Sequence, residues 1–317
     1  MVRPESAGGL GTLTAALAAR RYFIDGANKS NIALELGISR FKVARLLDFA
    51  LRDGIVRIDV SAPPEIDIEL SGELAARYGL RGAIVTRSIE GPEELQRSQL
   101  GRACAQLLTQ TLEPSDVLGI SWGRTLHSMV AHLSRLPACT VVQIVGGVPT
   151  LDLDVNSMEL VRRVVECTGG PVYPLYVPLL VESPETAASL RRDPYVGRTI
   201  AMFDQLTRAV VGIGAWTGSG STVRAALPSD LAAELDAAGA VADVCSTVLD
   251  RDGREVVSKA VLGRLIAISP SQLRAVPDVL AIAGGEAKGP AIAAALRGGL
   301  IHRLITDEKA ARLLLES

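Results

Sequence analysis

Residues 28–53 constrain the fold more than any other part of the chain, because they carry the pattern of two short helices joined by a tight turn. Apolar residues recur at helical spacing on both sides of Gly37, where the chain must turn with no Cβ in the way. Ser30 and Ser39 stand where a hydroxyl oxygen would accept hydrogen bonds from the first N–H groups of each helix. The stripes expected to be buried are Ile32, Ala33 and Leu36 in the first helix and Val43, Leu46, Leu47 and Ala50 in the second.

Such a pair is typical of a helix-turn-helix, whose second helix enters the major groove of DNA. The N-terminus of the second helix, and its side away from the apolar stripe, carry polar and cationic side chains that can reach base edges and phosphates. Phe41 could touch a thymine methyl group or simply pack. The alternative is an ordinary helical hairpin with a basic, solvated face. The predicted DNA-binding residues are Ser30, Ser39, Arg40, Phe41, Lys42 and Arg45.

Charge is distributed unevenly along the chain. The net charge is −2, so the molecule lacks the strongly basic balance of a protein that coats nucleic acid without sequence preference. Residues 1–60 nevertheless carry nine basic and six acidic side chains, an excess of +3, which leaves −5 for the remainder. A mildly basic N-terminal segment joined to an acidic remainder is consistent with a protein that contacts double-stranded DNA at one end only.

The segments around the helix pair predict a small N-terminal domain. A strand is expected over residues 55–60, which alternate apolar and polar side chains and would form a wing after the second helix. Residues 61–64, Ser-Ala-Pro-Pro, break regular structure, so we expect a DNA-binding domain over residues 1–62 and a second domain over 63–317. A preceding helix over residues 13–26 would pack on the pair through Ala15, Ala16, Ala19, Tyr22 and Phe23.

Beyond residue 66 the sequence alternates short apolar runs with amphipathic helices, which is typical of buried parallel strands. We therefore expect a doubly wound α/β domain, in which ligands bind at the carboxyl ends of the strands. Helices are predicted over residues 69–78 and 92–112. The predicted strands are 82–86, 116–121, 139–145, 172–176 with 178–180, 208–213, 240–245, 279–283 and 302–306.

Four of these strands run into glycines: 123 after the second, 146 and 147 after the third, 212 and 214, and 284 and 285. Glycine lets backbone N–H groups approach an anion, and the start of the next helix adds its positive dipole end. Ser121 and Thr125 offer hydroxyl groups there, and Arg124 and Lys288 offer cations. The strand ends predict a cup for a small anionic or hydroxyl-rich ligand. The alternative is that the glycines form ordinary turns, that the two hydroxyl groups cap a helix and that the two cations lie on the surface.

Several other kinds of site are not indicated. Cys104, Cys139, Cys167 and Cys245 lack the spacing of a disulfide framework or a zinc site, and no histidine pairs with them. No cofactor is expected. No signal peptide and no apolar run long enough to span a membrane is recognised, so we expect a cytoplasmic protein with no membrane partner.

With these features in view, the chain resembles SorC-type transcriptional regulators, the sugar-responsive family often grouped with DeoR-like repressors. The resemblance covers almost the whole length. It rests on IALELGISRFKVARLLDFALRDGIVRIDV at 32–60, VLGISWGRTL at 117–126, VVGIGAW at 210–216 and LAIAGGEAKGPAIAAALRGGLIHRLITDEKAARLLL at 280–315. The last segment is the most specific, because its glycine pair, Lys288 and ITDE turn follow the order of the family.

The resemblance implies an N-terminal winged helix-turn-helix and a C-terminal effector domain similar in fold to sugar-phosphate isomerases. It also implies palindromic operator DNA, a sugar or sugar-phosphate effector, and a homo-oligomer, either a dimer or a tetramer built from dimers. The family pattern has more glycine where this chain has Ala242, Cys245 and Ser246, so the rim of the effector pocket would differ from that of the family. The effector-binding residues implied are Ser121, Gly123, Arg124, Thr125, Gly146, Asp243, Gly284, Gly285 and Lys288.

Three functions follow from these observations. The first is a ligand-controlled DNA-binding regulator. The second is a sugar-phosphate isomerase-like enzyme with an attached helix-turn-helix, for which Asp243 and Glu286 are the candidate acids and bases and Lys288 a candidate Schiff-base amine. The third is a DNA-binding structural factor with no small ligand. The glycine-rich cup argues against the third, and the lack of a recognisable acid/base pair argues against the second.

Overall fold

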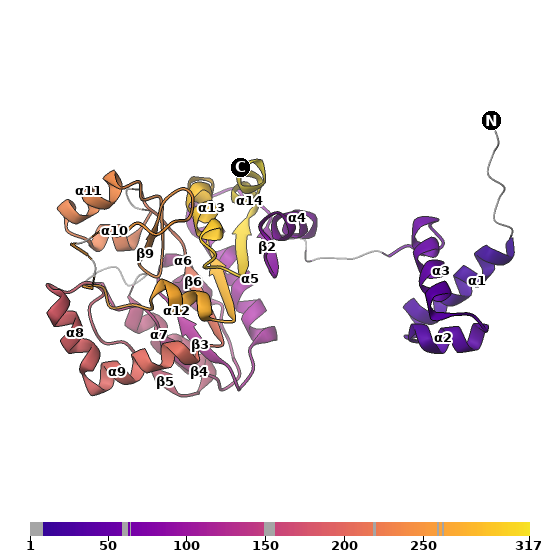
Figure 1. Cartoon of the computed structure of the whole chain (residues 1–317), viewed down its shortest axis with the longest axis horizontal. Helices are drawn as coiled ribbons and strands as arrows, with labels where there is room; N and C mark the ends of the chain where they lie inside the picture. Colours follow the sequence, from indigo (N-terminus) through magenta and orange to yellow (C-terminus); the bar gives the residue numbers. More distant parts are fainter. Residues whose placement is uncertain are drawn as a thin grey trace. The chain divides into compact units, whose positions relative to one another are not determined.

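The computed structural model describes residues 9–58, 63, 65–148, 156–217, 220–258, 260–261 and 263–317, and the side chains of residues 9 and 10 are not described. Contacts divide the chain into two units, residues 1–61 and 62–317 (Figure 1). Each unit has its own hydrophobic core, and each is described by itself. No helix among the described residues is long and apolar enough to cross a membrane.

The N-terminal unit consists of helices packed around a small core. Helix α1 (Gly9–Ala19) continues into a π-helical turn, η1 (Arg20–Ile24), and is followed by α2 (Lys29–Leu36) and α3 (Arg40–Arg52). Gly37 ends α2 in the left-handed conformation at φ 63°, which a residue with a Cβ rarely adopts. The predicted turn between the two helices is therefore present. The buried side chains are Ala15, Ala18, Ala19, Ile32, Val43, Leu47 and Ala50.

Two details of this unit differ from the sequence predictions. Asn28, not Ser30, caps α2, because its side-chain oxygen accepts from the amides of Ser30 at 3.0 Å and Asn31 at 2.9 Å. Ser39 caps α3 as predicted, accepting from the Lys42 amide at 3.2 Å. Tyr22 and Phe23 are 37% and 38% exposed instead of buried, because they lie in the wider π-helical turn, which shifts them off the packing face of α1.

The strand expected over residues 55–60 is not seen in its described part. Residues 55–58 form a bend and irregular chain, and Val56 N donates to Ala50 O at 2.9 Å, so the chain folds back against the end of α3. Residues 59–62 lie outside the described residues, and a wing stays a prediction.

The C-terminal unit is a mixed α/β structure built on an eight-stranded sheet. Every described neighbouring pair in this sheet is parallel except β1 with β2. The order in which strands are added changes side between β3 and β6, because β4 and β5 follow on the far side of β3 whereas β10 and β11 follow on the far side of β6. Such a switch point is where ligands bind in open α/β sheets. In order, the strands are β1 (Ile66–Asp67), β2 (Gly82–Thr86), β11 (Arg303–Asp307), β10 (Asp278–Ile282), β6 (Arg208–Gly212), β3 (Val117–Ile120), β4 (Thr140–Gln143) and β5 (Val172–Tyr173).

Helices cover this sheet in two groups (Figure 1). The first group is α5 (Glu93–Thr111), α6 (Arg124–Ala131) and α7 (Ser157–Thr168). The second is α4 (Ile68–Tyr78), α13 (Gly289–Arg297) and α14 (Glu308–Glu316). The remaining helices are α8 (Pro184–Arg192), α9 (Pro194–Ala201), η3 (Met202–Gln205), α10 (Thr222–Ala226), α11 (Ser229–Ala237), α12 (Pro270–Ala275) and η4 (Glu286–Lys288).

The predicted strand 240–245 does not belong to the large sheet. It is β8 (Ala242–Val244), which pairs antiparallel with β7 (Gly214–Ala215) and with β9 (Thr247–Leu249) in a separate three-stranded sheet. Every residue of β8 and β9 is buried, so the sequence of these short antiparallel strands has the pattern that also predicts a buried parallel strand. The predicted run 172–176 with 178–180 is likewise shorter than expected, since only Val172–Tyr173 forms a strand and Pro178 and Leu180 form isolated bridges.

Candidate functional site

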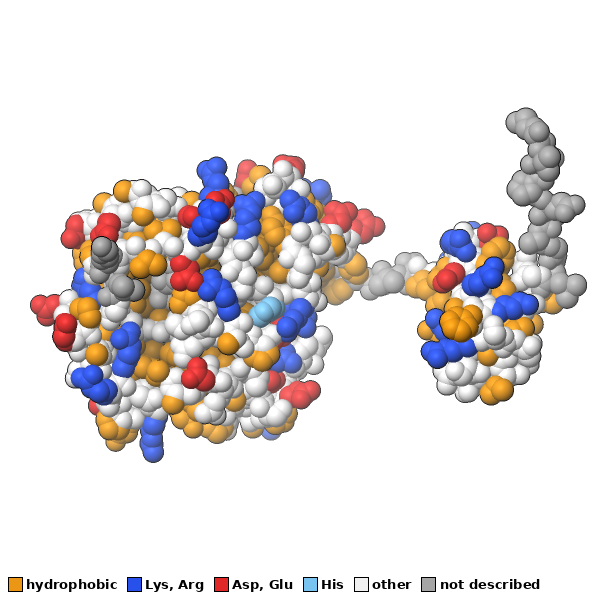
Figure 2. All heavy atoms as spheres, in the orientation of Figure 1, with side chains coloured by type: hydrophobic (Ala, Val, Ile, Leu, Met, Phe, Trp, Pro, Cys, Tyr) orange, Lys and Arg blue, Asp and Glu red, His pale blue; other side chains and the backbone are white. Residues whose placement is uncertain are grey.

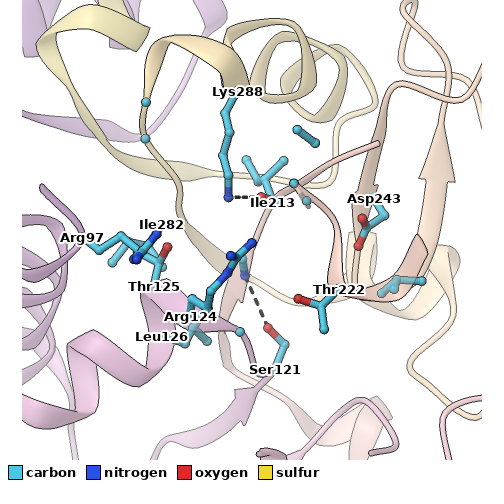
Figure 3. Close-up of a pocket in the computed structure, with 18 of the residues that line it drawn as sticks. Arg97, Ser121, Arg124, Thr125, Leu126, Ile213, Thr222, Asp243, Ile282 and Lys288 are labelled. Carbon is cyan, nitrogen blue, oxygen red and sulfur yellow. Dashed lines mark hydrogen bonds between the residues drawn. The ribbon is translucent and has the colours of Figure 1, made fainter. Parts of the chain in front are cut away.

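A cavity of about 550 Å³ lies at the carboxyl ends of β3, β6 and β10, which are neighbours in the sheet. The small antiparallel sheet supplies a further wall through β7 and β8. Figure 3 shows Arg124 and Lys288 reaching into the cavity from different walls, with Asp243 and Thr222 on another. The predicted residues that line it are Ser121, Gly123, Arg124, Thr125, Asp243, Gly284, Gly285 and Lys288.

The end of β3 supplies the first of these groups. Ser121 is buried, and its Oγ accepts from the Gly212 amide at 3.3 Å, which ties the end of β3 to the end of β6. Gly123 has φ 145°, a conformation that other residues rarely adopt, and α6 begins at the next residue. Within the described residues no side chain caps the start of α6. Its positive dipole end, Arg124 and the Thr125 hydroxyl therefore meet at the cavity.

Lys288 approaches from the opposite wall, where the short helix η4 follows β10. Its Nζ donates to the Ile213 carbonyl oxygen at 2.9 Å, which holds the ammonium group between the ends of β10 and β6. Burial lowers the pKa of Lys288, and the nearby Asp243 carboxylate acts in the opposite direction. An anionic ligand would favour the charged ammonium form further.

Asp243 is a buried acid in the wall formed by β8. Its Oδ1 accepts from the Ser221 hydroxyl at 2.5 Å. Burial raises the pKa of Asp243 to about 6, while the Ser221 hydrogen bond and the charge of Lys288 limit the rise. Gly214 faces this carboxylate, and a Cβ there would come within 2.1 Å of Asp243 Oδ1. The carboxylate is therefore an acceptor held at the cavity wall, suited to hydroxyl donors.

The glycine pair after β10 is shaped by a residue outside the cavity lining. Asp307 at the end of β11 accepts a hydrogen bond from the Gly285 amide. A Cβ on Gly284 would come within 2.3 Å of Asp307 Oδ2, and Gly285 has φ 97°. Both positions therefore require glycine, and the pair exposes its backbone to the cavity.

Gly146 is the one predicted effector-binding residue that does not line this cavity, although its neighbour Val145 does. A Cβ on Gly146 would come within 2.9 Å of Leu179 N and of the Pro178 carbonyl group. Its carbonyl oxygen accepts from Trp122 Nε1 at 2.9 Å. Gly146 is a site of close backbone packing outside the lining of this cavity, and its contact with an effector stays a prediction.

The sequence reasoning did not assign several polar lining residues to this site, among them Glu93, Arg97, Thr217, Thr222, Cys245 and Ser246. Glu93 and Arg97 come from the first turns of α5, and Arg97 pairs with Glu93 at 2.9 Å and with Glu94 at 2.7 Å. No sequence signal places the start of α5 beside the ends of three distant strands. Cys245 gave a partial signal, because it and Ser246 adopt positive φ values of 49° and 68° where more glycine was expected.

The lining residues can bind an anion that also carries hydroxyl groups. Arg97, Arg124 and Lys288 bring positive charge, and Asp243, Ser121 and Thr222 bring acceptors and donors. Within the described residues no group of three or more His, Cys, Asp or Glu side chains could hold a metal ion.

Five of the six predicted DNA-binding residues lie together at the start of α3. Ser39, Arg40, Phe41, Lys42 and Arg45 are exposed, and Phe41 is 84% exposed, so it does not pack within its unit. Ser30, in the first turn of α2, is also exposed. Figure 2 shows Lys and Arg side chains beside apolar ones on the visible face of the N-terminal unit.

Comparison with known proteins now identifies the family. Residues 62–316 match the family model described as "Putative sugar-binding domain". The chain belongs to this sugar-binding-domain family. The transcriptional regulator LsrR of Klebsiella pneumoniae is 31% identical to it over 300 residues, which are 93% of this chain and 90% of the relative. The sorbitol operon regulator of Klebsiella pneumoniae is 30% identical over 311 residues, 94% of this chain and 96% of the relative.

The solved structures agree with the sequence relatives. The crystal structure of the full-length sorbitol operon regulator SorC from Klebsiella pneumoniae matches with a TM-score of 0.73 and 28% identity, covering 96% of this chain and 99% of that one. The resemblance to SorC-type regulators is confirmed. These family members are named as regulators, which gives the enzyme alternative no support.

Proposed function

We propose that this member of the sugar-binding-domain family is a DNA-binding transcriptional regulator controlled by a sugar, polyol or sugar-phosphate effector. In this proposal residues 1–62 form a winged helix-turn-helix that binds operator DNA, and residues 63–317 bind the effector and assemble the oligomer. The likeness of the effector domain to sugar-phosphate isomerases is part of the same proposal.

The observation that carries the proposal is the cavity at the carboxyl ends of β3, β6 and β10. The start of α6, Arg124 and Lys288 would hold a phosphate or carboxylate group, because helix dipoles and charge-assisted hydrogen bonds favour anions. The Asp243 carboxylate would accept hydrogen bonds from sugar hydroxyls. A cation-rich end and an acid-containing wall in one cavity fit a phosphosugar better than a free sugar.

The DNA-binding half of the proposal rests on the exposed start of α3. Arg40, Lys42 and Arg45 would reach phosphates and base edges, and Phe41 would face the major groove. Two such helices in a dimer would read half-sites one helical turn apart, so a palindromic operator is expected. Effector binding would change the DNA affinity by favouring one arrangement of the oligomer.

Fluorescence anisotropy on duplexes tiled across the DNA upstream of the gene would test this function. We expect sequence-preferring binding that weakens steeply with salt and changes when one sugar phosphate from a panel is added. Arg45→Ala should weaken this binding, whereas Arg254→Ala, which removes an exposed cation in the other unit, should not. Binding without sequence preference, or unchanged by every effector, would contradict the proposal.

A further inference from the structure

Asp307 lies just outside the cavity, yet it is completely buried. Its carboxylate accepts three backbone hydrogen bonds. One comes from Gly285, and the others come from Lys309 at 3.0 Å and Ala310 at 3.1 Å in the first turn of α14. A buried carboxylate needs such donors, but an N-cap needs only the last two. The bond to Gly285 therefore calls for its own explanation.

On the cavity side, Asp307 fixes the loop after β10. The Gly285 amide donates to Oδ2, and Gly284 has no room for a Cβ because the same oxygen would lie 2.3 Å away. Both glycines line the cavity, and Lys288 follows three residues later in η4. A ligand that moved this loop would act directly on the Asp307 carboxylate through the Gly285 amide.

On its other side, Asp307 adjoins the edge of the sheet where the chain enters this unit. Asp307 pairs with Thr86 in the β11–β2 ladder, and Thr86 pairs with Ile66 in β1. Two further bonds reinforce this edge, from Arg87 N to Glu65 O at 2.8 Å and from Ser88 N to Glu308 Oε2 at 3.2 Å. Only two strand pairings separate the cavity loop from the segment that leads to the N-terminal unit.

We propose that Asp307 is a positioning residue that ties the loop 284–288 to strand β1. Ligand binding in the cavity then alters the segment of chain that leads to the N-terminal unit. The inference rests on the proposed function, since it explains how an effector in this cavity changes DNA binding. The test of this coupling is the change in DNA affinity that a ligand in the cavity produces.

Two variants separate the bond to Gly285 from the cap of α14. Asp307→Asn keeps one cap oxygen but can place an NH₂ group against the Gly285 amide, where two donors oppose each other. Asp307→Ser keeps a capping hydroxyl, because serine is a preferred N-cap residue, but its side chain is too short to reach Gly285. Asp193→Ser is the matched control, because Asp193 caps α9 through Tyr195 N at 2.9 Å and Val196 N at 3.2 Å and is not among the described residues that line the cavity.

The first experiment uses the full chain and the duplex that it binds, with ribose 5-phosphate, glucose 6-phosphate and inorganic phosphate as probes. For the probe that changes wild-type DNA affinity, we expect both Asp307 variants to need about tenfold more of it for half saturation, measured by thermal shift. At saturation, the fold-change in their DNA affinity should fall toward one. Asp193→Ser should keep the wild-type response.

A second experiment needs no ligand. Hydrogen–deuterium exchange should speed up in Asp307→Ser both over residues 282–288 and over residues 65–67, and in neither segment for Asp193→Ser. A wild-type fold-change in DNA affinity, or unchanged exchange over residues 65–67, in the Asp307 variants would overturn this inference alone. A wild-type protein that responds to no probe would overturn the proposed function and this inference with it.

Discussion

Two glycine pairs follow buried parallel strands in this molecule, and only one pair opens onto the cavity. Gly284 and Gly285 follow β10, and their backbone lines the cavity beside Lys288. Gly146 and Gly147 follow β4, and their backbone is engaged by the segment 177–179: Gly147 N donates to Val177 O at 2.9 Å, and Leu179 N donates to Gly147 O at 2.7 Å. A glycine pair at a strand end therefore marks a place where another group can come close to the backbone. After β4 that group is another segment of the chain, whereas after β10 the backbone is open to a ligand in the cavity.

Gly146→Ala should have the largest effect on stability, because the new Cβ would come within 2.9 Å of backbone atoms that cannot rotate away. We expect a loss of about 3 kcal/mol in the free energy of unfolding, at the upper end of typical overpacking costs. Chemical denaturation measures it.

The affinity of the folded variant for sugar phosphates should stay at the wild-type value. Gly285→Ala is the matched comparison, because its Cβ would make only an ordinary contact, 4.0 Å from Gln96 Oε1, but its φ of 97° is strained for alanine. That variant should lose effector affinity. A Gly146→Ala variant that kept wild-type stability but lost effector affinity would contradict the distinction drawn between the two glycine pairs.

Asp243→Asn should change the dependence of stability on pH. The pKa of Asp243 is about 6 in the folded protein, against 3.8 for an exposed aspartate. The folded state thus holds this proton more tightly, so wild-type stability should fall as pH rises between these values. From about pH 4.5 to about pH 8, the variant should gain about 2 kcal/mol relative to the wild type. A difference between the two proteins that stays constant with pH would contradict the assigned burial.

Lys288→Met should weaken binding of sugar phosphates about tenfold, or about 1.4 kcal/mol, because it removes one charge-assisted contact. The matched control is Lys309→Met, because Lys309 is an exposed lysine outside the cavity lining. Thermal-shift titrations with ribose 5-phosphate and inorganic phosphate measure both variants. Equal losses in the two would mean that general charge, not the glycine-rich end of β10, attracts the anion.

The same kind of comparison applies to two exposed apolar residues of the N-terminal unit. Phe41 and Leu34 are 84% and 83% exposed, but only Phe41 lies on α3. If Phe41 contacts a thymine methyl group, replacing that thymine by uracil should cost the wild type about 0.8 kcal/mol, or about fourfold in affinity. Phe41→Ala should bind both duplexes equally, and Leu34→Ala should behave as the wild type. A methyl effect that persists in Phe41→Ala would remove this residue from base reading.

Features set by neighbouring residues could be predicted from the sequence. The turn at Gly37 and the cap at Ser39 depend on a few adjacent residues, and the start of α3 was found correctly. The cap of α2 was assigned to Ser30 instead of Asn28, because two capping residue types stand close together in the sequence. The exposure of Tyr22 depends on a π-helical turn that no residue pattern announced.

The cavity could be predicted only in part. Ser121, Arg124 and Lys288 were found because parallel strands bring their carboxyl ends to one edge of a sheet. Arg97 and Thr222 were missed because their neighbours in space are distant in the sequence. Gly146 does not line the cavity, and the sequence could not show this, because its packing partners lie about thirty residues further along the chain, at Pro178 and Leu179.

The central claim is that the cavity and the DNA-binding unit influence each other, and reciprocity tests it most directly. The affinity of the active sugar phosphate for the full chain should be measured with and without saturating operator duplex. The account predicts that DNA changes the sugar-phosphate affinity by the same factor by which the sugar phosphate changes DNA affinity, as linkage requires. Equal sugar-phosphate affinity in the presence and absence of the duplex would contradict it.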